Sequence, residues 1–141
     1  MSIESPDETT RQQISAMRRS YGVEGITDLG TDPIAAFTAW LREAAANQFI
    51  VEANAMVLST LGAAADGSDL LTSRTVLLKD ISDGGFTFFT NYNSRKGKAI
   101  ELQSQVALLF PWYAMERQVA ITGFASQIER SESENYFASR P

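Results

Sequence analysis

The segment from Asn91 to Lys98, NYNSRKGK, combines the residue types that bind phosphate. It follows a predicted strand and precedes a predicted helix, for which Ser94 is a suitable N-cap. Arg95 and Lys96 then fall in the first helical turn, where cations oppose the positive end of the helix dipole. A bound anion reverses this effect, because free N–H groups, a hydroxyl and two cations would all face it. Taken alone, the pattern favours the alternative, a solvated basic turn, because short motifs have many false matches.

Two cations, Arg74 and Lys79, interrupt the apolar strand that we predict at residues 70–80. Side chains five positions apart in a regular strand point to opposite faces of the sheet, so one of the two could simply face solvent. Alternatively, both approach a ligand from different sides or at the ends of the strand. The residues alone leave both interpretations open.

Three further polar side chains stand where a ligand could be held. Gln118 opens the last long strand, and an amide that both donates and accepts suits the edge of a heterocycle. Tyr136 and Arg140 are four residues apart on one side of the last predicted helix, where they could clamp a phosphate. The alternatives are an exposed polar residue for Gln118 and an ordinary amphipathic helix for the pair, and both are the commoner case.

The composition excludes several classes of chemistry. The chain has no Cys and no His, which removes thiolate catalysis, the usual general base and the commonest metal ligands. No phosphate-cradling glycine loop and no cluster of metal ligands is present, so we predict no metal site. The net charge of −5 argues against nucleic acid as a partner. No apolar run approaches the roughly 20 residues that cross a bilayer, and the polar N-terminus is not a secretory signal, so a cytoplasmic location is expected.

The elements that must position these side chains begin with helices. Residues 1–10 are polar and acidic and are expected to form a flexible tail. A short helix is predicted at 11–21, and a stronger one follows Asp32 and Pro33, a suitable N-cap and first residue, and runs to about residue 47.

The rest of the chain has the pattern of β-structure. Predicted strands cover residues 55–61, 70–80, 85–91, 105–112 and 117–129. Asp66-Gly67 is the strongest turn signal, and short helices are predicted at 94–103 and 131–139. Successive strands joined by tight turns imply an antiparallel sheet, and so many in a short chain suggest a small barrel. The predicted fold class is therefore mainly β with short helices, in one domain over residues 11–141.

Four strings in order and at matching spacing carry a resemblance to the pyridoxamine 5′-phosphate oxidase family. They are RTVLLKD at 74–80, FTFFTNYNSRKGKAIEL at 86–102, ALLFPWYAMERQVAITG at 107–123 and SENYFASRP at 133–141. Upstream, MRRSYG at 17–22 and the helix from Asp32 to Leu41 are also similar to the family. The resemblance therefore covers nearly everything from Ile14 to the end of the chain.

This resemblance implies an FMN-binding split β-barrel that works as a homodimer, with FMN at the subunit interface. It implies oxidation of pyridoxamine 5′-phosphate or pyridoxine 5′-phosphate to pyridoxal 5′-phosphate, with O2 as acceptor and H2O2 as product. The cofactor performs the redox step in such enzymes, which suits a chain without His or Cys. Catalytic side chains are therefore not assigned.

The resemblance also implies site residues, position by position. The cofactor-binding residues would be Arg74, Thr75, Val76, Leu77, Leu78, Lys79, Phe89, Thr90, Arg95, Lys96 and Gln118. The substrate-binding residues would be Arg18, Tyr21, Lys79, Tyr136 and Arg140. Arg74, Arg95 and Lys96 would reach the FMN phosphate, and Gln118 would hydrogen-bond the flavin.

The family continues beyond the position of Pro141 with a Trp-Gly-Gly segment and an Arg-Leu-His-Asp-Arg motif, which add flavin and substrate contacts. Relative to the family, the domain is expected to be incomplete at its C-terminus. The alternative to an oxidase is accordingly a non-catalytic module that binds flavin or pyridoxal phosphate.

Overall fold

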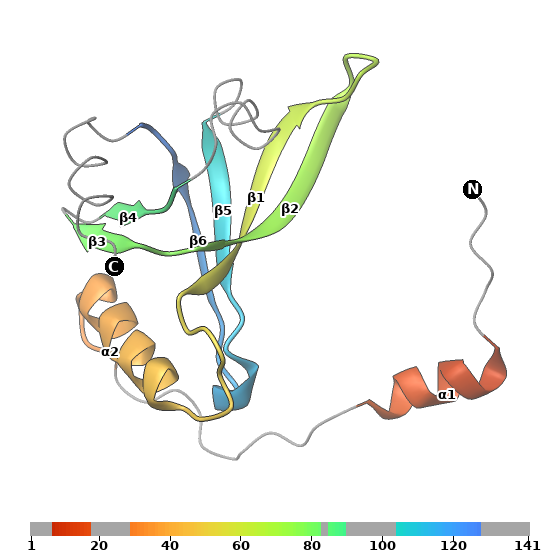
Figure 1. The fold of residues 1–141 in the computed structure, drawn as a ribbon, viewed down its shortest axis with the longest axis horizontal. Helices are drawn as coiled ribbons and strands as arrows, with labels where there is room; N and C mark the ends of the chain where they lie inside the picture. Colours follow the sequence, from red (N-terminus) through yellow and green to blue (C-terminus); the bar gives the residue numbers. More distant parts are fainter. Residues whose placement is uncertain (1–6, 18–28, 83–84, 90–103, 128–141) are drawn as a thin grey trace.

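The fold is built on antiparallel strands with one helix packed against them, and it is described from a computed structural model (Figure 1). The structure describes residues 7–17, 29–82, 85–89 and 104–127. The helices are α1 (Glu8–Ala16) and α2 (Pro33–Ala46), with a short 3-10 turn η1 (Tyr113–Met115). The strands are β1 (Ala55–Ala63), β2 (Asp69–Leu77), β3 (Asp80–Ser82), β4 (Gly85–Thr87), β5 (Gln105–Phe110) and β6 (Val119–Phe124).

Helix α2 begins where the sequence predicts. The carboxylate of Asp32 accepts hydrogen bonds from the N–H groups of Ile34 at 3.0 Å and Ala35 at 3.3 Å, and Pro33 occupies the first turn. These bonds satisfy two of the four N–H groups that every helix start leaves without a partner. The prediction of this helix is confirmed, with its end at Ala46.

Helix α1 begins at Glu8, three residues before the predicted start at residue 11. Asp7 is the reason, because its carboxylate accepts a hydrogen bond of 2.7 Å from the N–H of Thr10 and caps the helix. The helix ends at Ala16, before the predicted end at residue 21, and none of its residues is buried. Figure 1 shows it apart from the sheet.

Strands β2, β1, β5 and β6 form, in that order, a four-stranded sheet in which each neighbouring pair is antiparallel. The β1–β2 hairpin closes as predicted at Asp66-Gly67. The N–H of Ala64 donates to the carbonyl of Ser68 at 2.8 Å, and Gly67 takes a φ of 85°. A positive φ is readily adopted by glycine, which explains why this dipeptide makes the turn.

The strand predicted at 70–80 is divided in the structure. Strand β2 ends at Leu77, and β3 begins at Asp80 in a separate two-stranded sheet with β4. The N–H of Leu78 donates to the carbonyl of Asn54 at 2.8 Å, while that of Lys79 donates to Thr87 at 2.8 Å. The chain therefore passes from one sheet to the other between these two residues, as strands do at the corners of barrels.

The remaining strands are shorter than predicted. Strand β4 covers 85–87 of the predicted 85–91, β5 covers 105–110 of 105–112, and β6 covers 119–124 of 117–129. The predicted helices at 94–103 and 131–139 lie outside the described residues. The mainly β, antiparallel class is confirmed, although no ladder joins β6 to β2 among the strands that the structure describes.

The core lies between α2 and the two sheets, with Phe37 at its centre. Its ring lies 5.1 Å from that of Phe86 in β4, 5.0 Å from Phe110 in β5 and 5.7 Å from Trp112, measured between centroids. Phe37 is 5% exposed. Because Phe86 and Phe110 belong to different sheets, this one side chain of α2 packs against both. Within the described ranges, no helix is long and apolar enough to cross a membrane.

Candidate functional site

Arg74 is the one charged side chain on the inner face of β2, among otherwise uncharged neighbours. It lies opposite Leu58 in β1 and shares its face of the sheet with Thr72 and the core residue Val76. One guanidinium nitrogen donates to the carbonyl of Leu58 at 3.1 Å and another to the hydroxyl of Thr72 at 2.5 Å. These bonds fix the plane of the guanidinium.

The bonds of Arg74 leave donors for a ligand. A guanidinium carries five N–H groups, and two are used by protein acceptors among the described residues. Partial burial lowers the pKa of Arg74 because it removes water from the cation. An arginine nevertheless stays charged at neutral pH, so this position offers a preoriented cation for an anionic group.

The rest of the predicted cofactor-binding run on β2 divides between core and surface. Val76 and Leu78 are 6% and 5% exposed and belong to the core, whereas Thr75 is exposed and Leu77 is half-buried. Lys79 is exposed at the point where the chain enters β3. Of this run, the side chains of Thr75, Leu77 and Lys79 are thus accessible at the surface.

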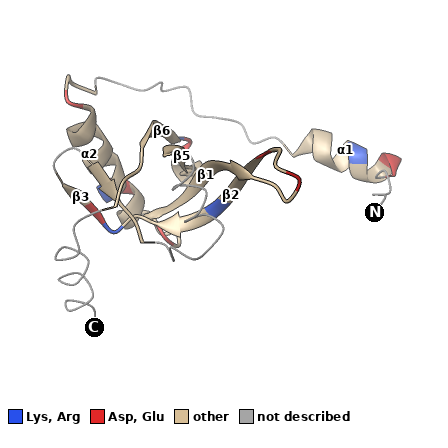
Figure 2. Cartoon of the chain, turned by 90° about the horizontal axis from the view of Figure 1, so that it is seen from above, with Lys and Arg blue, Asp and Glu red and all other residues tan. Residues whose placement is uncertain are grey.

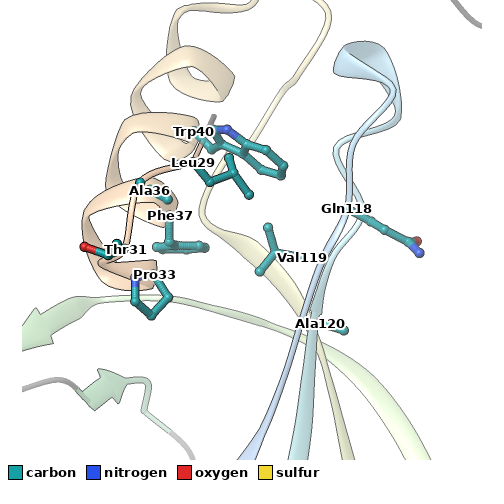
Figure 3. A pocket seen from close by; sticks show the side chains of 10 residues that line it. Leu29, Thr31, Pro33, Ala36, Phe37, Trp40, Gln118, Val119 and Ala120 are labelled. Atoms are coloured by element: carbon teal, nitrogen blue, oxygen red, sulfur yellow. The ribbon is translucent and has the colours of Figure 1, made fainter. Parts of the chain in front are cut away.

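Gln118 is exposed directly before β6, at the rim of a cavity of about 450 Å³. Figure 3 shows the cavity between the start of α2 and β6, with Val119 facing the helix and the Gln118 amide pointing away from it. The lining is largely apolar and consists of Leu29, Gly30, Thr31, Pro33, Ala36, Phe37, Trp40, Gln118, Val119 and Ala120. Apolar surface with few polar groups is typical of small-molecule sites.

The sheet separates Arg74 from Gln118. A row of backbone partners runs from Thr75 through Val57 and Leu109 to Ala120, so β2 and β6 are the two edges. Three inter-strand spacings of about 4.8 Å put these edges about 14 Å apart. Arg74 also lies on the inner face and Gln118 on the outer side, so one chain does not bring them together.

Arg117, the residue before Gln118, makes contacts to α2 that the sequence did not predict. Its guanidinium lies 4.6 Å from the centroid of the Trp40 ring and forms an ion pair with Glu43, and both partners belong to α2. Trp40 and Glu43 are three residues apart, which puts them side by side on a helix. The sequence predicts that Trp40 and Glu43 lie side by side, but it does not predict that both contact Arg117, which follows Glu43 by 74 positions.

The remaining predicted site residues are Phe89 and seven that lie in other parts of the chain. Phe89 is half-buried and lies two residues after the end of β4. The residues Arg18, Tyr21, Thr90, Arg95, Lys96, Tyr136 and Arg140 lie outside the described ranges. In the part of the chain that the structure does describe, no group of three or more Asp or Glu residues could hold a metal ion.

Comparison with known proteins identifies the family. The sequence profile of the family described as pyridoxamine 5′-phosphate oxidase matches residues 43–141, more than half of the chain. The chain therefore belongs to the pyridoxamine 5′-phosphate oxidase family, as the four strings predicted.

Curated relatives support the same assignment. A pyridoxine/pyridoxamine 5′-phosphate oxidase from Prochlorococcus marinus (strain MIT 9303) is 49% identical over 143 residues, which cover 100% of this chain and 60% of that protein. One with the same name from Streptomyces avermitilis is 46% identical over 132 residues, covering 90% and 57%. The chain thus spans about 60% of the length of these relatives.

Solved structures agree on the fold. PhzG from Burkholderia lata 383, solved in complex with tetrahydrophenazine-1-carboxylic acid, matches with a TM-score of 0.69 and 30% identity, covering 81% of this chain and 54% of that one. A pyridoxamine 5′-phosphate oxidase-related, FMN-binding protein from Nostoc punctiforme matches with a TM-score of 0.54 over 75% of this chain. Its identity of 17% supports the fold alone.

Proposed function

We propose that this protein binds FMN and oxidises pyridoxamine 5′-phosphate or pyridoxine 5′-phosphate to pyridoxal 5′-phosphate. Family membership supports the class of reaction. The observation that carries the cofactor assignment is Arg74, a cation held by Leu58 and Thr72 with N–H groups left for an anion. A phosphate group is the anion that FMN would present to it.

The residues fit the cofactor in chemical type. Arg74, Arg95 and Lys96 would neutralise its phosphate, and Gln118 would donate to and accept from the flavin edge. The remaining cofactor contacts would come from residues 75–79, Phe89 and Thr90. When bound, FMN supplies the redox chemistry, accepting a hydride from the substrate's C4′ carbon and passing the electrons to O2 to give H2O2.

We propose that cations and phenols near the two ends of the chain bind the substrate, together with Lys79. Tyr136 and Arg140 would hold its phosphate, because a guanidinium binds phosphate oxygens with two parallel bonds. Lys79, Arg18 and Tyr21 would complete the site. Lys79 is exposed beside Asp80 at the end of the cofactor-binding run, which is compatible with contact to both molecules.

We further propose that two copies of the chain form the flavin site. Arg74 and Gln118 lie on opposite edges and faces of one sheet, so a second copy is needed to bring such a pair together. The outer face of the sheet is suited to this contact. Strands β1, β5 and β6 carry no charged residue (Figure 2), and Leu71 and Phe124 on that face are 77% and 81% exposed.

The first test is a visible spectrum and an FMN titration of the purified chain, with a peroxide assay on pyridoxine 5′-phosphate and sedimentation velocity on the same sample. Flavin absorbance, peroxide release and a dimer are expected. Flavin binding without peroxide would replace the oxidase by a flavin-binding module. A monomer that binds no flavin would refute the proposed site.

A further inference from the structure

The segment between β5 and β6 is held firmly at its first turn. The indole of Trp112 is 2% exposed, and its N–H donates to the carbonyl of Ala53 at 3.0 Å. Its ring packs against those of Phe37 and Phe110, with centroids 5.7 Å and 5.4 Å away. Residues before the 3-10 turn therefore belong to the core and have little freedom to move.

The second half of this segment has less support from the core. After the 3-10 turn, Glu116 takes a left-handed conformation with a φ of 55°, which costs free energy for a residue other than glycine. The N–H of Arg117 donates to the carbonyl of Trp112 at 3.2 Å. Contacts beyond the segment can add to the hydrogen bonds that close this tight turn.

Arg117 supplies such contacts through its side chain. The guanidinium lies over the Trp40 ring at 4.6 Å from its centroid and pairs with the Glu43 carboxylate, so it joins the entrance of β6 to α2. The side chains of Arg117 and Glu43 are 32% and 57% exposed, so the ion pair alone contributes little. Stacking of the same cation on an indole adds a directional contact to it.

The direction of Arg117 is related to that of Gln118. In an extended chain, neighbouring side chains point to opposite sides, so a side chain fixed against α2 directs the next one outward. Figure 3 shows this alternation, with Val119 toward the helix and Gln118 away from it. A shift of one residue in the pairing of β6 would exchange the directions of Gln118 and Val119.

We propose that Arg117 is a positioning residue that presents the Gln118 amide to the cofactor, a role that rests on the proposed FMN site. It touches neither cofactor nor substrate. It acts by clamping the entrance of β6 to Trp40 and Glu43 of α2.

Two variants and a control test this proposal. Arg117→Met keeps most of the aliphatic side chain and removes the cation, whereas Arg117→Lys keeps a cation that can pair and stack. Arg42→Met is the matched control. Arg42 is exposed on α2, the helix that Arg117 contacts, and it makes no ion pair within the described residues. FMN affinity is measured by quenching of flavin fluorescence, and hydrogen exchange of the peptide at 116–120 is measured without FMN.

Arg117→Met should weaken FMN binding about threefold to tenfold, the loss expected for a stacked and paired cation at the surface. Exchange at 116–120 should become faster while exchange at 55–63 in β1 stays unchanged. Arg117→Lys should restore much of both, and Arg42→Met should alter neither.

Unchanged exchange at 116–120 in Arg117→Met would overturn the clamp, and weaker FMN binding with unchanged exchange would mean direct contact instead. Faster exchange with unaltered FMN affinity would overturn the link to Gln118. If the wild-type chain binds no FMN, the cofactor proposal fails by itself, and the exchange comparison alone then decides whether Arg117 holds this segment.

Discussion

Phe37 is the side chain on which the packing of α2 against both sheets depends, so Phe37→Ala should be severely destabilising. The ring is 5% exposed and has aromatic neighbours at 5.0 to 5.7 Å in β4, β5 and the segment that follows β5. Replacing a buried Phe by Ala removes its transfer free energy and leaves a cavity, with a typical cost of about 3–5 kcal/mol.

The arrangement of the rings favours the upper part of that range. Aromatic pairs contribute about 0.5–1.5 kcal/mol each beyond the area that they bury, and Phe37 takes part in three. Small domains have free energies of unfolding of about 5–15 kcal/mol. A loss of about 5 kcal/mol would therefore remove a third or more of the free energy of unfolding. Phe37→Leu should cost less, because it fills part of the cavity.

Urea unfolding of the whole chain, followed by tryptophan fluorescence, measures the difference. The buried Trp112 ring reports on the same cluster. Phe49→Ala is the matched control, since Phe49 is 76% exposed and its loss should cost no more than about 0.5 kcal/mol. A cost for Phe37→Ala that equals the control's would refute the reasoning that α2 is held by this ring.

Three further predictions concern charge. Arg74→Met should weaken FMN binding roughly tenfold to a hundredfold in a fluorescence titration, because a charge-assisted hydrogen bond contributes about 1.5–3 kcal/mol, while the melting temperature stays the same or rises. Arg95→Ala with Lys96→Ala should weaken FMN binding in the same titration, and unaltered affinity would remove these residues from the phosphate site. Hydrogen bonds from Ser68 lower the pKa of Asp66, so its contribution to the hairpin is present above its unfolded pKa and is lost as pH falls through the folded value. Asp66→Ala should flatten the acid side of the stability profile in thermal melts between pH 2 and 5, and an unchanged slope would contradict this assignment.

Local signals predicted the parts of the fold that local interactions make. The cap at Asp32 and the turn at Asp66-Gly67 are formed by hydrogen bonds between residues two or three positions apart. The residues that cause them therefore stand together in the sequence. Asp7 is an equally local signal, because it stands three residues before the N–H that it caps, although the acidic composition around it favours a tail.

The features that the sequence did not reveal depend on contacts between residues that are far apart in the chain. Nothing in RTVLLKD marks a break, since it has neither Gly nor Pro. The division between Leu77 and Asp80 arises because Asn54 and Thr87 take the next two N–H groups. The same applies to Arg117, whose partners on α2 precede it by more than 70 residues. Resemblance supplied the candidate ligand residues, but only the register showed that Arg74 and Gln118 lie on opposite edges.

The distribution of charge gives a reason for Arg74 that packing does not. In the strands of the four-stranded sheet, only Asp69 at the hairpin end and Arg74 are charged, although 21% of the whole chain is. Arg74 is partly buried and its hydrogen bonds go to a carbonyl and a hydroxyl, so among the residues that the structure describes it has no paired carboxylate. Burial of a cation without a counter-charge costs free energy that an apolar side chain of similar size would not incur. The guanidinium is therefore better explained by an anionic ligand than by the fold, and this is the physical basis for the proposal that the phosphate of FMN binds beside β2.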